Sequence, residues 1–217
     1  TVANDVLRML KRLFDYAVVR GMIEVNPAIS FGSKDAGGKE QGRKRALSRD
    51  ELIQFFKALR RGRGISRENE LTFKIILALG VRKMELCAAE WAEFDLKNAV
   101  WHLPGIRAKN GDDIDIPLPQ PVIEWIEEIR LFAGDSRWLI PARRARTTSH
   151  VSRATLNMVM PAVLKEMPDV EPFSIHDLRR TMRTQMAALG IDPVIAERCL
   201  NHKIPGVEGI YNRHEYF

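Results

Sequence analysis

Six side chains in this sequence have the types and the order that suit chemistry on a phosphate ester. They are two arginines, two histidines, a lysine and a tyrosine: Arg82, Lys109, His176, Arg179, His202 and Tyr211. Guanidinium and imidazole groups bind phosphate oxygens through charge-assisted hydrogen bonds, and an activated phenol is a nucleophile. Together these groups can hold a phosphodiester and attack it without a metal ion.

His176 and Arg179 are three residues apart at the start of a predicted helix, after Phe173-Ser174-Ile175. This spacing puts both side chains on one helix face, and helix N-termini favour anions. Both side chains and the helix end can therefore address one phosphate, although an HxxR pair alone is common by chance.

Gly80 is predicted to end an apolar helix, so that Arg82 projects from the following turn. Glu85 lies one turn further on and can hold the Arg82 side chain by a charged hydrogen bond. The ordinary alternative for such a pair is an exposed Arg–Glu contact on the surface.

Lys109 lies in a short turn, 107–111, between two predicted strands. A lysine there can donate a proton to a leaving oxygen, and the alternative is a solvated turn lysine. His202 follows a predicted apolar helix, and Tyr211 comes nine residues later. The alternative for Tyr211 is a core tyrosine.

The apolar periodicity predicts an α+β fold that is mainly α-helical, with a small antiparallel sheet near its middle. Helices are predicted over 3–20, 48–59, 66–80, 83–91, 121–132, 151–165, 176–189, 192–200 and 206–213, with strands at 99–103 and 114–118 and an extended piece at 138–140.

The chain is predicted to have three parts. Residues 1–29 look like the end of a helical domain whose beginning is missing, and residues 30–46, rich in glycine, serine and charge, form a basic linker. Residues 47–217 form the main domain. Because the first residue is Thr1 rather than methionine, we expect a processed product or an expressed fragment.

The net charge is +6, and the basic residues cluster in two stretches, 34–67 and 136–165, the second of which contains no Asp or Glu. Such clustering favours a nucleic-acid partner over the alternative, which is a charged surface that contacts only water. The residues predicted to contact DNA are Arg43, Lys44, Arg45, Arg143, Arg144, Arg146 and Arg153.

The remaining composition excludes several classes of protein. No apolar run is long enough to span a bilayer, and no signal peptide is evident. Cys87 and Cys199 are predicted to be buried free thiols in a reducing compartment. Asp112, Asp113 and Asp115 are interpreted as a solvated hairpin edge, because neighbouring strand residues point opposite ways, so no metal or other cofactor is predicted.

The joint order of these residues resembles the catalytic domain of tyrosine recombinases, the phage integrase family, and most of all prophage and genomic-island integrases. The matching strings are LALGVRKMEL (77–86), IRAKNGDDIDIPL (106–118), SIHDLRRT (174–181) and CLNHKIPGVEGIYNRHEY (199–216). The likeness runs from about residue 47 to the end, and residues 4–28 resemble the end of that family's core-binding domain. Asn201 departs from the family, since many members have glycine there.

The resemblance implies that Tyr211 attacks a DNA phosphate, displaces the 5′-oxygen and forms a 3′-phosphotyrosyl intermediate. It further implies that Arg82 and Arg179 clamp the phosphate, with Glu85 supporting Arg82, and that Lys109 is the general acid. His176 would accept the tyrosine proton or bind the phosphate, and His202 would donate to a phosphate oxygen.

The implied partners are double-stranded attachment-site DNA, a homotetramer on two duplexes formed from free monomers, and DNA-bending accessory proteins. No membrane is involved, and the implied location is the cytoplasm, at the bacterial nucleoid. The alternatives are a type IB topoisomerase, a catalytically idle DNA-binding regulator and, more distantly, a metal-dependent nuclease.

Overall fold

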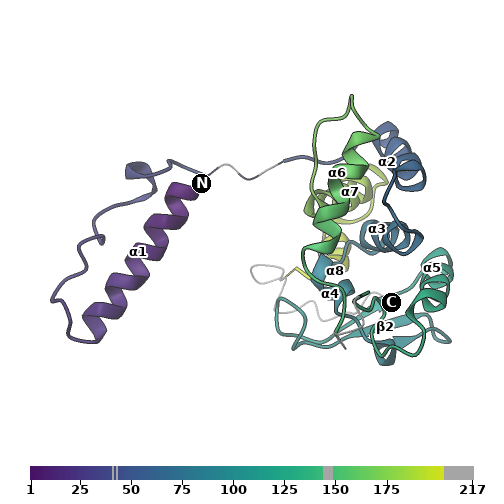
Figure 1. Cartoon of the computed structure of the whole chain (residues 1–217), viewed down its shortest axis with the longest axis horizontal. Coiled ribbons are helices and arrows are strands. Elements are labelled where there is room, and N and C mark those ends of the chain that lie inside the picture. The colour runs from purple at the N-terminus through teal and green to yellow at the C-terminus, as the bar shows by residue number, and fades with distance from the viewer. Residues whose placement is uncertain (41, 43, 144–148, 203–217) are drawn as a thin grey trace. The chain divides into compact units, whose positions relative to one another are not determined.

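The structure is a computed structural model that describes residues 1–40, 42, 44–143 and 149–202. The chain divides into two compact units, Thr1–Lys44 and Arg45–Phe217. Each unit is described by itself (Figure 1).

The first unit is built on α1 (Val2–Val19), which confirms the helix predicted over 3–20. A short 3-10 turn, η1 (Ser33–Asp35), follows, and the chain then returns to the start of α1. The Asn4 side chain accepts a hydrogen bond from Gly37 N at 2.8 Å and donates one to Gly38 O at 3.0 Å. Part of the stretch 30–46 is therefore bound to the helix, and the proposed linker boundaries stay predictions.

The second unit combines helices with one small sheet, as the α+β prediction requires. Its elements are α2 (Arg49–Arg61), α3 (Arg67–Leu79), α4 (Lys83–Cys87), η2 (Trp91–Glu93), β1 (Phe94–Asp95), β2 (Val100–Leu103), β3 (Ile114–Pro117), α5 (Gln120–Ala133), α6 (Thr155–Lys165), α7 (Ile175–Ala188) and α8 (Pro193–Cys199). The sheet is antiparallel in the order β1-β2-β3, and Trp101 pairs with Ile116.

Local capping signals explain where the helices begin and end. Ser48 and Glu51 form the predicted capping box of α2, with Ser48 N donating to the Glu51 carboxylate at 2.7 Å. Ser66 caps α3, and Gly80 ends it at a positive φ of 60°, where glycine carries no steric penalty.

Two predicted helices are markedly shorter in the structure, and one observed strand was not predicted. The predicted helix 83–91 ends at Cys87, α6 begins at Thr155 rather than at 151, and β1 was not predicted. The extended piece at 138–140 forms an isolated bridge between Trp138 and Glu90, and Leu139 N donates to Ala89 O at 2.8 Å. The predicted helix 206–213 lies outside the described residues.

The core of the second unit is centred on α3, which packs against both α5 and α7 (Figure 1). Phe55 of α2 is fully buried, with its ring 6.1 Å from that of Phe73 and 5.7 Å from that of Phe173. Burying one such side chain contributes about 1.5–3 kcal/mol. Because the candidate residue Arg82 follows α3 directly, this core fixes the position of the site.

The two cysteines are both free, but only Cys87 is buried. The prediction that Cys199 is buried is wrong: Ala196 and Leu200 fill the inner face of α8, and Cys199 lies at the edge of that face, exposed. Among the helices that the structure describes, none has the length and apolarity needed to cross a membrane.

Candidate active site

A pocket of about 550 Å³ in the second unit brings together four of the six residues proposed from the sequence. Arg82 comes from the turn between α3 and α4, Lys109 from the β2–β3 loop, and His176 and Arg179 from the first turns of α7. His202 contacts this group through Arg179, whereas Tyr211 lies outside the described residues.

Arg82 is held as the sequence predicted. Its guanidinium Nη1 donates to Glu85 Oε1 at 2.9 Å, and its backbone N donates to Glu85 Oε2 at 2.8 Å. The Arg82 side chain is 22% exposed and the Glu85 side chain 5% exposed. Glu85 therefore both caps α4 and orients Arg82 at the pocket.

Arg179 is buried on the inner side of the pocket, with 5% of its surface exposed. Its guanidinium donates to the backbone carbonyls of Gly80 and Leu200, and Nη2 lies 3.1 Å from His202 Nε2. Burial, and then the nearby Arg82 charge, lower the pKa of Arg179 to about 10. The side chain thus joins the end of α3, the start of α7 and the turn after α8.

The arrangement of charges favours a bound anion. In addition to burial, the positive charge of Arg82 repels that of Arg179 and lowers the pKa of Arg179, while the carboxylates of Glu85 and Glu197 act in the opposite direction. An anion between two guanidiniums removes that repulsion and accepts their hydrogen bonds. A phosphate group is therefore a fitting occupant of this pocket.

His202 is oriented by a carboxylate that the sequence reasoning missed. Its Nδ1 contacts Glu197 Oε2, and the other oxygen of Glu197 accepts from Arg183 Nε at 2.7 Å. Arg183 first, and then His202, hold the pKa of Glu197 below its usual value. A carboxylate on one ring nitrogen fixes the tautomer and leaves the other nitrogen toward the pocket. Glu197 and His202 are five residues apart, whereas residues on one helix face are three or four apart, so the sequence did not indicate that the two side chains meet.

His176 lines the pocket from the first turn of α7, and its ring reaches the surface. Partial desolvation, followed by the charges of Arg180, Arg179 and Arg82, lowers the pKa of His176. A neutral imidazole at pH 7 is a proton acceptor. The adjacent Asp177 is fully buried and caps α7 instead, accepting from Ser174 N at 2.8 Å.

Lys109 is exposed in the loop that joins β2 to β3. The hairpin is confirmed, but its connection spans residues 104–113 rather than a short turn. Gly105 N donates to Asp113 Oδ1 at 2.6 Å and closes the base of the loop. A Cβ on Gly105 would lie 2.4 Å from Gly111 O, so the close approach requires glycine.

The residues predicted to contact DNA have different environments. The Arg45 guanidinium donates to the Glu51 carboxylate, to Ala46 O and to Glu171 O, and its side chain is 9% exposed, so Arg45 braces the fold and its contact with DNA stays a prediction. Arg143 pairs with Glu68 at 3.0 Å but is 68% exposed. Lys44 and Arg153 are exposed, and Arg153 lines the pocket. Arg43, Arg144 and Arg146 lie outside the described residues.

Within the part of the chain that the structure describes, no group of three His, Cys, Asp or Glu residues could hold a metal ion. Asp113 accepts from Gly105, and Asp115 contacts His102 Nδ1 at 2.6 Å. These hairpin carboxylates therefore act within the sheet and its loop.

Comparison with known proteins identifies the family. The family model "Phage integrase family" matches residues 45–216, and the chain belongs to this family of tyrosine recombinases. The prophage integrase IntZ of Escherichia coli (strain K12) is 24% identical over an alignment 218 residues long, which covers 99% of this chain and 51% of that protein. The chain thus spans about half the length of this relative.

Two solved structures have the same fold as this chain. One is the Tn1549 transposon integrase (R225K) in complex with a circular intermediate DNA, at a TM-score of 0.71, 17% identity, 92% coverage of this chain and 70% of that chain. The other is a lambda integrase tetramer bound to a Holliday junction, at a TM-score of 0.71, 19% identity, 93% coverage of this chain and 58% of that chain. At these identities, the similarity establishes the fold of a tyrosine recombinase catalytic domain.

Proposed function

We propose that this chain is the catalytic part of a site-specific DNA recombinase that cuts and rejoins DNA through a 3′-phosphotyrosyl intermediate. The observation that carries the proposal is the convergence of Arg82, Lys109, His176 and Arg179 on one pocket, although they are up to 97 residues apart in the sequence. Family membership supports the same chemistry.

In the proposed first step, Tyr211 attacks a DNA phosphate and the bond from phosphorus to the 5′-oxygen breaks. Arg82 and Arg179 stabilise the charge on the two nonbridging oxygens, where preorganised donors are most effective. His176, kept neutral by its lowered pKa, accepts the tyrosine proton. Lys109 gives a proton to the leaving oxygen, and His202, in the form that carries a proton on both ring nitrogens, donates to the phosphate through Nε2.

The second step is the reverse reaction with a different DNA end. A 5′-hydroxyl attacks the phosphotyrosyl ester and releases Tyr211, so the ester itself conserves the phosphodiester bond energy. If the 5′-hydroxyl comes from a partner strand, the result is strand exchange and hence integration or excision of a mobile element. If it comes from the same strand, the result is relaxation of supercoils, as in a type IB topoisomerase.

The proposed partners follow from the same chemistry. Attachment-site DNA is the substrate, and four protomers on two duplexes are the assembly, which the lambda integrase tetramer on a Holliday junction supports. DNA-bending accessory proteins and a location at the nucleoid are parts of this proposal. Exposed basic residues such as Arg143 and Arg153 are candidates for phosphate contacts.

The test is capture of the covalent intermediate. The protein is mixed with fragmented genomic DNA from its source, denatured with SDS, and DNA still attached to protein is recovered and sequenced. We expect adducts that are lost in Tyr211→Phe and retained in the matched variant Tyr16→Phe, with cleavage at one sequence. Adducts that persist in Tyr211→Phe, or cleavage that requires a divalent metal, would contradict the proposal.

A further inference from the structure

The loop that carries Lys109 is fixed to the rest of the unit at two points, one on each side of this lysine. Two residues before it, Arg107 Nη1 donates to Glu85 O at 2.9 Å, and Arg107 Nη2 forms an ion pair with Glu93. Directly after it, the Asn110 side chain donates to Asn201 O. We call residues 104–113 the Lys109 loop.

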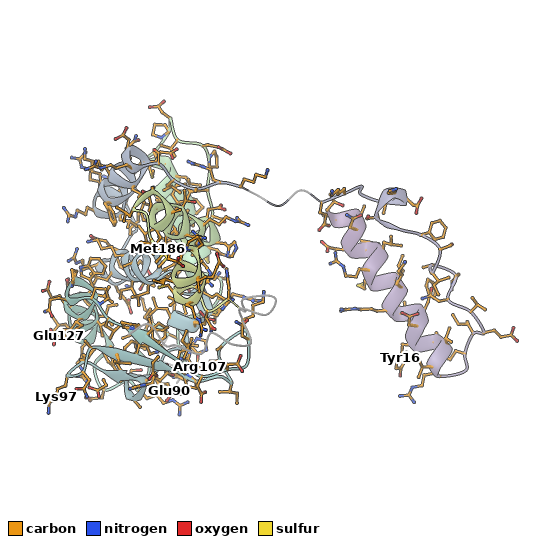
Figure 2. All side chains as sticks on the ribbon, turned by 180° about the vertical axis from the view of Figure 1, so that it is seen from behind. Tyr16, Glu90, Lys97, Arg107, Glu127 and Met186 are labelled. Atoms are coloured by element: carbon orange, nitrogen blue, oxygen red, sulfur yellow. The ribbon has the colours of Figure 1, made fainter. Side chains whose placement is uncertain are left out.

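The Arg107 contacts join this loop to two elements at once. Glu85 belongs to the α4 turn that orients Arg82, so the loop contacts the same segment that presents the first guanidinium. Glu93 also accepts a hydrogen bond from Trp101 Nε1 at 2.9 Å, and Trp101 is fully buried in β2. Figure 2 shows Arg107 beside the sheet, at the end of the unit that carries Glu90.

The burial of these groups makes the contact strong. The side chains of Arg107 and Glu93 are 19% and 10% exposed. Charged groups held in this way are oriented by both Coulomb attraction and hydrogen-bond geometry. Removal of the guanidinium leaves Glu93 with the bonds that it accepts from Trp101 Nε1 and Glu90 N, and with no positive partner among these contacts.

The Asn110 contact joins the loop to the opposite side of the pocket. Asn201 adopts a left-handed backbone with a φ of 47° and precedes His202 directly. Lys109 is therefore flanked by one contact to the Arg82 segment and another to the His202 segment. The Asn201 side chain also approaches Asn110, with Oδ1 at 3.3 Å from Nδ2.

Hydrogen bonds within the loop limit its backbone further. Ala108 N donates to Pro104 O and Gly105 O, both at 3.1 Å, and Gly111 N donates to Ala108 O at 3.1 Å. Ala108 is buried while the next residue, Lys109, is exposed. The Lys109 side chain is thus free to reach a ligand, but its Cα is held in place.

We infer that Arg107 and Asn110 are positioning residues that place the Lys109 ammonium against the leaving oxygen of the DNA phosphate. This inference rests on the proposed function. Misplacement of a catalytic group by about 1 Å costs about 100-fold in rate. Arg107 and Asn110 act through Lys109 and need not touch the DNA.

The proposed role can be tested through the proton that Lys109 gives to the leaving oxygen. When Tyr211 bonds to phosphorus, the bond to the 5′-oxygen breaks and Lys109 supplies the proton that this oxygen requires. If sulfur replaces the bridging 5′-oxygen, the leaving group is a thiolate, and thiols have a pKa of about 8.5. A thiolate departs without a proton, so its departure does not depend on where Lys109 lies.

The experiment measures covalent adduct formation on two DNA duplexes that carry the captured cleavage site, one with a bridging 5′-oxygen and one with a bridging 5′-sulfur. The variants are Arg107→Ala and Asn110→Ala, with Lys109→Ala as a reference. Arg130→Ala, which removes an exposed arginine that stacks on Trp91, is the matched control. Thermal melts and DNA binding are measured for each protein.

We expect Arg107→Ala to slow cleavage of the oxygen substrate about 100-fold and the sulfur substrate less than about threefold. Asn110→Ala should show the same pattern more weakly, and Arg130→Ala should cleave both substrates normally. If Arg107→Ala does not fold, Asn110→Ala decides the question, because Asn110 is only partly buried.

Equal losses on both substrates in a folded variant, or no loss on the oxygen substrate, would overturn the positioning role alone. Absence of an adduct from the unmodified protein on both substrates would overturn the proposed function, and the positioning role with it. The two failures are therefore distinguishable.

Discussion

Arg179 of α7 donates a hydrogen bond to the carbonyl oxygen of Gly80, the residue that ends α3. The two residues are 99 positions apart in the sequence. Because Arg82 follows Gly80 by two residues, this bond links the two guanidiniums of the pocket through a single turn of backbone. The relative position of Arg82 and Arg179 therefore depends on how α3 ends.

Substitution of Gly80 by alanine should damage both stability and cleavage. Gly80 has a φ of 60°, and a Cβ would lie 2.8 Å from side-chain atoms of Leu200 and Met182. The left-handed conformation costs alanine about 1–2 kcal/mol, and the contacts add to this. Denaturant unfolding and adduct formation provide the measurements.

Gly190→Ala is the matched control, because Gly190 also has a positive φ, of 75°, but a Cβ there meets nothing within 4 Å. This variant should lose stability through strain alone and retain cleavage. Equal loss of cleavage in the two variants would contradict the link between Gly80 and Arg179.

Glu197→Gln should slow cleavage about tenfold or more while DNA affinity changes little. The carboxylate accepts from Arg183 and holds His202 at Nδ1, whereas a neutral amide is a weaker partner for both groups, so the His202 ring is no longer held in place. Single-turnover cleavage measures the effect, and Glu127→Gln on the exposed face of α5 (Figure 2) is the control. An unchanged cleavage rate would remove Glu197 from the site.

The pH dependence of cleavage should report His176. Burial and neighbouring arginines lower the pKa of His176, so the neutral, proton-accepting form persists to a pH below its usual value of 6.5. Cleavage should therefore remain constant as the pH falls toward 6.5 and decline only below the lowered pKa. The measurement is the rate of cleavage between pH 5 and pH 8, on DNA that carries the cleavage site recovered from the covalent adducts. The fall in rate on the acid side of this profile, its acid limb, reports His176.

Arg180→Gln removes one of the charges that lower the pKa of His176, so the acid limb should move to higher pH. Arg180→Lys keeps the charge and should leave the limb where it is. A limb that does not respond to Arg180→Gln would mean that another group controls the acid side.

The two thiols should react with alkylating reagents at very different rates. Burial raises the pKa of Cys87 to about 12, which suppresses the reactive thiolate, whereas Cys199 is exposed and its pKa is raised less. At pH 8, mass spectrometry should show one label on the native chain, at Cys199, and two after denaturation. Rapid labelling of Cys87 in the native chain would contradict its burial.

Local signals in the sequence were sufficient for most of the helices. Ser48, Ser66 and Gly80 mark helix ends through contacts within a few residues, and such contacts can be inferred from spacing alone. The two-residue strand β1 exists because Phe94 pairs with Trp101 in β2, and so short a strand has no periodicity to detect.

The candidate site was predictable where residue type carries the chemistry, as for Arg82, Lys109 and His176. Residues that support them were missed, because Glu197 and Arg107 resemble ordinary surface charges until tertiary packing brings their partners close. Arg45 differs from these residues, because its basic neighbours in the sequence led to the prediction that it contacts DNA. In the folded unit its guanidinium donates to Glu51 and to Glu171 O, and the second of these acceptors is 126 positions away in the sequence.

The convergence of the pocket from three distant segments also makes the pocket a property of the folded unit as a whole. Arg82, Lys109 and Arg179 approach one another only when α3, the sheet and α7 are packed together. Unfolding of single domains is usually cooperative, so a chain that loses this packing separates all of these side chains at once. A partly unfolded copy is therefore expected to keep no partial form of this pocket.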